Sequence, residues 1–159
     1  MFKLMNILFL DLYPNVPYRI SKDQNGAYGT ANSYGNNLFS KLLNLFVKSS
    51  IDCPQLFAVQ SIGELKSSGH KVSYSKKIDE NLKYDFIVIP SSIVCHETEV
   101  ETIKTLKKKE NIIFVIGPFA TSNPQNYLKA GAKVVIGEPE MFFHNFNYKI
   151  EEIKVMPKL

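Results

Sequence analysis

The sequence predicts an α/β fold in which a five-stranded parallel sheet is flanked by helices. Short apolar runs at 84–90, 112–116 and 133–136 each stop abruptly at small or turn-forming residues. They lack the polar alternation of a strand with one wet face, so they are typical of strands buried on both faces of a parallel sheet. Such sheets bind ligands at the edge formed by the carboxyl ends of their strands.

The composition fits one ordinary domain. The chain has 159 residues, of which 45% are hydrophobic and 21% charged, and this length supports a single core. Its apolar runs are far shorter than the roughly 18 residues that a membrane span needs. The first residues lack the long apolar region and cleavage site of a secretory signal. We therefore expect a cytoplasmic protein that does not bind membranes.

Charge and cysteine content exclude two further classes of function. The net charge is +4, and the lysines are spread along the chain apart from the cluster 107–109. That cluster ends a predicted helix, where cations complement the dipole, and no basic stripe interleaves with aromatic residues, so we do not expect nucleic-acid binding. Cys53 and Cys95 have no metal-type spacing, and the chain contains neither CxxC nor CxxxCxxC. It therefore encodes no zinc or iron–sulfur site of its own.

The first predicted strand, 5–13, is apolar throughout and should be central in the sheet. Asp11 falls near its carboxyl end, where an aspartate either caps the following turn or meets a ligand. Both interpretations stay open.

A long insert, 14–53, follows this strand, whereas loops between strands and helices in this fold usually take about 2–6 residues. Its first half is rich in Tyr and contains Gly26, Gly29 and Gly35; glycines permit close backbone approach to a ligand, so this half is predicted to be a shaped loop. Its second half begins an amphipathic helix. One face of that helix carries Leu38, Leu42, Leu45 and Phe46. We favour the interpretation that this helix covers a sheet edge over the alternative that it binds a partner.

The next helix is predicted over 54–69, with Pro54 at its first position and Gly69 at its left-handed end. Its predicted inward face consists of Leu56, Val59, Ile62, Gly63 and Leu65. A short edge strand follows at 70–75, and His70 is interpreted as a surface or turn histidine.

The rest of the chain alternates strands and helices. A linker at 76–83 leads to the strand at 84–90, and the helix 96–110 carries glutamates in its first turns and lysines in its last. Asn123–Pro124 begins a helix that ends at Gly131. Glu138 and Glu140 open a short helix, and we interpret them as capping residues. Right-handed crossovers then give the flavodoxin-like strand order 2-1-3-4-5, in a domain over 1–147 with a tail at 148–159 that leads out of it.

Catalytic motifs are scarce. The chain contains no GxSxG elbow, Walker loop or GxGxxG fingerprint, and its three histidines are scattered. A binding edge fits better, because Ser91, Ser92 and Gly117 should offer small side chains and free backbone N–H groups to a flat or bulky ligand.

These residues resemble a family, the N-terminal cobalamin (B12)-binding domain of B12-dependent radical S-adenosylmethionine (SAM) proteins. The resemblance covers roughly the whole chain and rests on an ordered set of segments. These are 19–36 (RISKDQNGAYGTANSYGN), Pro54–Leu56, Ser68–Val72, Asp85–Ile89, Ser91–Ser92, Phe114–Thr121, Pro124 and Gly137–Glu140.

The resemblance implies a Rossmann-like domain that holds cobalamin with its corrin ring over the edge of the sheet. The loops after the first, third, fourth and fifth strands would contact the cofactor. Carried over by position, the cofactor-binding residues are Asp11, Leu12, Tyr13, Ser91, Ser92, Ile93, Val94, Gly117, Pro118, Phe119, Ala120, Thr121, Gly137, Glu138, Pro139 and Glu140.

Three departures qualify this resemblance. Related cobalamin domains carry a cobalt-ligating histidine after the first strand, but the insert 14–53 contains no histidine, so we expect no lower His ligand from that loop. Pro118 and Pro139 replace glycines of the family and alter the fit. The missing CxxxCxxC motif assigns the iron–sulfur cluster and SAM to a radical SAM domain outside this chain, in cis or in trans. The chain alone is therefore predicted to bind cobalamin without being catalytic.

Two alternatives stay open. The domain could be a non-catalytic interaction module that has lost cobalamin and binds a partner through its insert and amphipathic helix. An edge blocked by Tyr28, Tyr34 or Phe119 would favour this alternative. It could also be the nucleotide-sugar-binding half of a glycosyltransferase, which no motif supports.

Overall fold

The structure is a computed structural model that describes residues 4–15, 22, 35–46, 54–78 and 82–144. The strands are β1 (Asn6–Leu10), β2 (Lys71–Ser75), β3 (Phe86–Pro90), β4 (Ile113–Ile116) and β5 (Lys133–Val134). The helices are α1 (Leu38–Phe46), α2 (Leu56–Ser67), α3 (His96–Lys107), α4 (Pro118–Ser122), α5 (Pro124–Ala130) and α6 (Pro139–His144). The predicted tail at 148–159 and most of the insert, including Tyr28 and Tyr34, lie outside the described residues.

The predicted sheet is confirmed. All five strands run parallel in the order β2-β1-β3-β4-β5. The register pairs Phe9 of β1 with Val88 of β3, and Ile89 of β3 with Val115 of β4. The carboxyl ends of β1, β3, β4 and β5 therefore lie next to one another along one edge.

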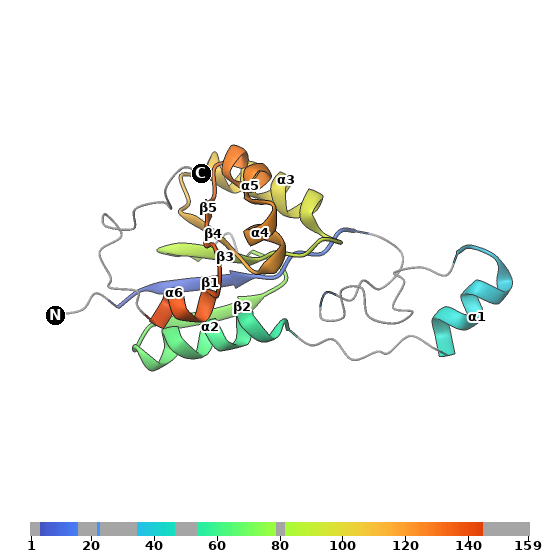
Figure 1. The fold of residues 1–159 in the computed structure, drawn as a ribbon, viewed down its shortest axis with the longest axis horizontal. Coiled ribbons are helices and arrows are strands. Elements are labelled where there is room, and N and C mark those ends of the chain that lie inside the picture. Colours follow the sequence, from blue (N-terminus) through green and yellow to red (C-terminus); the bar gives the residue numbers. More distant parts are fainter. Residues whose placement is uncertain (1–3, 16–21, 23–34, 47–53, 79–81, 145–159) are drawn as a thin grey trace.

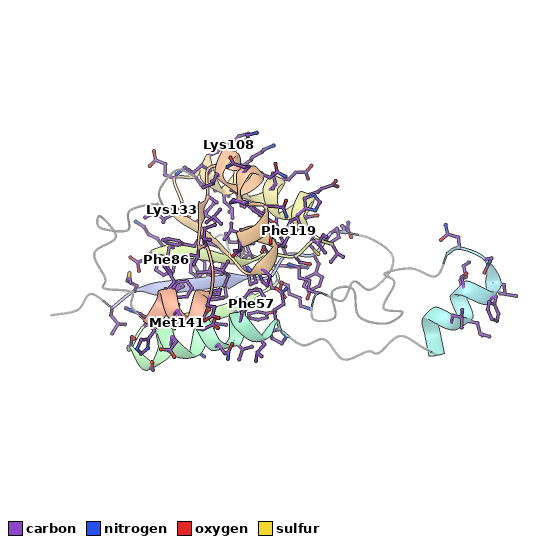
Figure 2. All side chains as sticks on the ribbon, in the orientation of Figure 1. Phe57, Phe86, Lys108, Phe119, Lys133 and Met141 are labelled. Atoms are coloured by element: carbon purple, nitrogen blue, oxygen red, sulfur yellow. The ribbon has the colours of Figure 1, made fainter. Side chains whose placement is uncertain are left out.

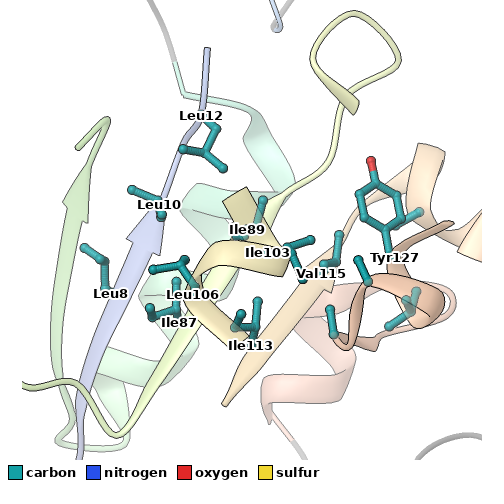
Figure 3. Packing of buried hydrophobic residues seen from close by; sticks show 14 residues of the cluster. Leu8, Leu10, Leu12, Ile87, Ile89, Ile103, Leu106, Ile113, Val115 and Tyr127 are labelled. Carbon is teal, nitrogen blue, oxygen red and sulfur yellow. The ribbon is translucent and has the colours of Figure 1, made fainter. Parts of the chain in front are cut away.

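Both faces of the central part of this sheet are buried, because alternate residues of β1, β3 and β4 enter different cores. Leu8, Ile87 and Val115 belong to the core under α3, α4 and α5 (Figure 3). Phe9 and Val88 belong to the core under α2 and α6. Figure 1 shows these two helix layers on opposite sides of the strands. An apolar strand without alternation, as in the sequence, is what such a double-sided core requires.

The buried face of α2 differs from the predicted one. Ala58, Ser61 and Leu65 are buried, whereas Leu56 is 72% exposed and Val59 is exposed as well. The helix begins at Leu56, after Gln55 at its N-cap position. Small side chains at 58 and 61 face inward, an arrangement that suits close packing of the helix on its neighbours.

Helix α1 does not cover a sheet edge, so that prediction is wrong. Leu38 is 87% exposed and Leu42 is 53% exposed. In Figure 1, α1 lies apart from the sheet. Its amphipathic pattern is present, but no packing surface in the described part of the chain buries it.

The structure corrects or refines three local expectations. His70 is buried rather than superficial, and its Nδ1 accepts a hydrogen bond from the Met5 N–H at 3.3 Å. Glu99 lies in the first turn of α3, as predicted, but its side chain is fully buried. The chain after Gly117 is not a loop, since it forms the short helix α4. None of the described helices is long and apolar enough to cross a membrane.

The double-sided core makes a testable prediction at its central strand. Replacing Ile87, which is fully buried in β3, with Ala should lower the free energy of unfolding by about 2–5 kcal/mol, because it leaves a cavity in packed surroundings. Ile93, which is 57% exposed, is the matched control, and Ile93→Ala should cost less than about 0.5 kcal/mol. Urea denaturation of both variants measures the difference, and equal losses would contradict burial of β3 on both faces.

Candidate functional site at the carboxyl edge of the sheet

A chain of hydrogen bonds links the loops that follow β3, β4 and β5. The Ser91 N–H donates to the Ile116 carbonyl at 2.8 Å, and the Ala120 N–H donates to Ser91 Oγ at 3.0 Å. The Gly137 N–H donates to Thr121 Oγ1 at 3.1 Å. The edge is therefore one connected surface.

The two serines shape this edge but do not present free groups, contrary to the sequence-based expectation. Both are buried. Ser91 Oγ is already an acceptor from α4, and Ser92 Oγ accepts from the Val94 N–H at 3.3 Å. The Ser92 N–H donates to Glu99 Oε2 at 3.3 Å. The hydroxyl oxygens of both serines thus help to fix the loop after β3.

Gly117 allows close packing at the centre of the edge. Its φ of +108° lies in the region that favours glycine, and a Cβ there would lie 2.6 Å from Cζ of Phe57. The aromatic ring of α2 therefore rests directly on the backbone after β4. Gly137 also has a positive φ, +89°, but no atom lies within 4 Å of where its Cβ would be.

A cleft of about 390 Å³ opens at this edge. Figure 2 shows Phe57 and Phe119, two of its wall residues, at the same end of the sheet. The cleft is lined by Lys22, Pro54, Gln55, Leu56, Phe57, Ser91, Pro118 and Phe119. Phe119 forms part of the wall and packs on Tyr127 and His96, with ring centroids 6.4 Å and 5.3 Å apart. It does not fill the cleft.

Gln55 carries the most informative polar group of this cleft. Its Nε2 donates to the Ser91 carbonyl at 3.3 Å, which fixes the orientation of the amide. Its Oε1 is buried and has no hydrogen-bond partner among the residues that the structure describes. A buried acceptor without a partner costs free energy, so a ligand that brings a donor into the cleft would satisfy it.

Next to the cleft, a buried ion cluster joins β1 to α3. Lys22 Nζ lies 3.0 Å from Asp11 Oδ1 and 2.9 Å from Glu99 Oε1, and all three side chains are buried. Tyr74 and Tyr13 donate to Asp11 Oδ2 at 2.5 Å and 3.2 Å.

Besides Lys22 and the Ser92 N–H, a tyrosine hydroxyl contacts Glu99. The Tyr127 hydroxyl donates to its Oε2 at 2.7 Å. Each carboxylate in the cluster is therefore surrounded by donors.

Burial and charge set the protonation of this cluster. Burial raises the pKa of Glu99, and the opposing charge of Lys22 offsets only part of that effect. Burial alone would lower the pKa of Lys22, but the carboxylates of Glu99 and Asp11 outweigh it and raise that pKa. Burial and the nearby carboxylate raise the pKa of Tyr127. Burial raises the pKa of Cys95 to about 11, so its thiol stays protonated and is a poor nucleophile.

The structure brings only some of the sixteen expected cofactor-binding residues to the cleft itself. Ser91, Pro118 and Phe119 line it, and Asp11 adjoins it through Lys22. Gly117, Ala120, Thr121 and Gly137 lie along the same edge. Ile93 and Glu138 are exposed, Tyr13, Val94 and Glu140 are half-buried, and Leu12 and Pro139 are buried. These last residues do not line the cleft.

Sequence reasoning missed the residues that organise the site, which are Lys22, Gln55, Phe57, Glu99 and Tyr127. Only Gln55 carries a local signal, since it is a polar residue directly before a helix. Among the described residues, no group of His, Cys, Asp and Glu side chains could hold a metal ion.

A comparison of the chain with protein-family models, curated proteins and solved structures finds no match.

The close packing on Gly117 is testable with Gly137 as its control. Gly137→Ala should cost about 1–2 kcal/mol of stability from its positive φ alone. Gly117→Ala should cost clearly more, because the new methyl group also displaces Phe57 from the cleft wall. Thermal unfolding compares the two variants, and adding Phe57→Leu should recover part of the Gly117→Ala loss. A penalty no larger than that of Gly137→Ala would refute the contact.

Proposed function

We propose that this chain is a cobalamin-binding module of a B12-dependent radical SAM enzyme and is not catalytic alone. The observation that carries the proposal is the cleft at the carboxyl edge of the sheet, with the unpartnered Gln55 Oε1 in its wall. Ligands of parallel α/β sheets bind at this edge. The resemblance of the edge segments to the cobalamin-binding family names the ligand.

The residues at the edge fit such a ligand chemically. Cobalamin is a large, flat macrocycle whose rim carries amide groups, and an amide N–H is a donor that Gln55 Oε1 can accept. Phe57, Pro118 and Phe119 supply apolar wall around that acceptor. A cleft of about 390 Å³ holds only one arm of so large a molecule. The open space at Gly137 leaves room for further contact along the edge.

Each residue then has a definite task. Gln55 orients the ligand by accepting a hydrogen bond, while its own orientation is fixed by the Ser91 carbonyl. Phe57 and Phe119 exclude water from that hydrogen bond, which strengthens it. When bound, cobalamin supplies a cobalt centre that can take up and pass on a methyl group. A radical SAM domain in cis or in trans would supply the iron–sulfur cluster and SAM, and we include a cytoplasmic location in the proposal.

A second candidate is the interaction module without cobalamin. The exposed apolar residues Leu38, Phe39 and Leu42 of α1 favour it, because such a group on one helix is typical of a protein-binding surface. The two candidates differ in whether the cleft takes a corrinoid.

Binding of hydroxocobalamin tests the first candidate. The 159-residue chain, mixed with hydroxocobalamin and passed through a gel-filtration column, should elute as a coloured protein fraction. Gln55→Leu should weaken binding about tenfold by removing the acceptor. Gln60→Leu on the exposed face of α2 is the matched control and should bind like the wild type. A colourless wild-type fraction would exclude the cofactor and favour the interaction module, and equal affinities of the two Gln variants would remove Gln55 from the site.

A further inference from the structure

Lys22 is a buried cation that comes from the insert and reaches the edge of the sheet. It is only 2% exposed. Besides its ion pairs with Asp11 and Glu99, its Nζ donates to the Pro90 carbonyl at 3.4 Å. One ammonium group therefore contacts the end of β1, the end of β3 and helix α3.

The described groups around the Lys22 ammonium favour its charged form. The two carboxylates flank it, and the ring of Tyr13 lies under it with 5.1 Å from Nζ to the ring centroid. Glu99 and Asp11 make the largest favourable electrostatic contributions to the charged form of Lys22, and they outweigh the cost of its burial.

The hydroxyls behind the carboxylates cannot replace the cation. Tyr74 and Tyr13 donate to Asp11, and Tyr127 donates to Glu99. These are neutral donors. Without Lys22, two buried carboxylates would face each other across the edge with no opposing charge from the described residues in direct contact, and an uncompensated buried charge strongly destabilises a fold.

The same side chain is part of the cleft wall. Lys22 lines the cleft together with Gln55 and Ser91. Lys22 bonds to the Pro90 carbonyl, and the next residue, Ser91, accepts a hydrogen bond from Gln55 through its own carbonyl. Lys22 also pairs with Glu99, which accepts from the Ser92 N–H. The position of the Gln55 acceptor thus depends on a loop that Lys22 holds in place.

We propose that Lys22 is a positioning residue of the cleft, which holds the ends of β1 and β3 at the spacing that ligand binding requires. It acts by neutralising Asp11 and Glu99 across the edge, and its own donors are directed to the protein rather than to the ligand. The identity of the ligand rests on the proposed function, whereas the positioning role is measurable without any ligand.

The test replaces Lys22 with Met, which has a similar length and no charge. At pH 7, Lys22→Met should lower the midpoint of thermal unfolding by about 10 °C. Deuterium exchange of the backbone amides at 88–95, which include the Ser92 N–H, should become at least tenfold faster. The affinity for hydroxocobalamin, measured well below the unfolding midpoint, should fall at least tenfold. Lys71→Met, which removes an exposed lysine of β2, is the matched control and should change none of these.

The pH dependence separates this role from simple loss of packing. Glu99 has a raised pKa in the folded protein, so its charged form costs stability as the pH rises above the value for the unfolded chain. Removing Lys22 removes the charge that opposes this shift, and the pKa of Glu99 rises further. The loss caused by Lys22→Met should therefore be larger at pH 7 than at pH 5. Lys22→Met combined with Glu99→Gln should be more stable than Lys22→Met alone at pH 7.

Each outcome decides between the proposals. Unchanged amide exchange at 88–95 in Lys22→Met, or a thermal loss independent of pH and not relieved by Glu99→Gln, would overturn the positioning role. Faster exchange with unchanged hydroxocobalamin affinity would overturn its link to ligand binding. If the wild type does not bind hydroxocobalamin while the exchange and pH results appear as expected, the cofactor assignment fails and the positioning role stands. If Lys22→Met does not fold at pH 7, the double variant supplies the exchange measurement.

Discussion

Burial of the sheet on both faces is the constraint on which the rest of the structure depends. Because alternate residues such as Leu8 and Phe9 enter different cores, neither face of the strands has room for an unpaired polar group. Polar side chains therefore gather where the strands end. At the carboxyl edge this concentrates two carboxylates, two serines and several tyrosine hydroxyls within one hydrogen-bonded surface. The polar site at the carboxyl edge thus follows from the helices that cover both faces of the sheet.

The two buried carboxylates at this edge need an opposing charge, and Lys22 of the insert supplies it. Asp11 and Glu99 approach the same buried point from β1 and α3, and Lys22 pairs with both. A buried carboxylate left without a cation would destabilise the fold by more than a surface ion pair could restore. The residue from the insert is therefore part of the domain's electrostatic balance, even though a minimal fold of this class has no such segment. The insert therefore stabilises the fold by neutralising buried carboxylates, in addition to any contact that it makes with a ligand.

The sheet was predictable from the sequence because its signals are local. Apolar runs, the glycines that end them and the helix between strands lie within a few residues of one another, and together they fix the strand order. The ion cluster was not predictable, since Glu99 and Lys22 are 77 residues apart and a single lysine in a polar segment has no periodicity. Glu99 satisfies the dipole rule for a helix start, but that rule does not say whether the side chain is exposed or buried. The face of α2 was also missed, because the inward residues Ala58 and Ser61 are small and the serine is polar.

The two prolines that depart from the family pattern have a structural explanation in this fold. Pro118 is the first residue of α4 and Pro139 is the first residue of α6, a position where the fixed φ of proline favours a helix and its missing N–H costs nothing. Pro139 is buried at the start of α6, whereas Pro118 is exposed and lines the cleft. Pro139 therefore acts on the fold, and Pro118 acts on the space that a ligand would enter. Under the proposed function, any difference in ligand from other cobalamin-binding domains should arise at Pro118, which lines the cleft together with Gln55, rather than in the sheet.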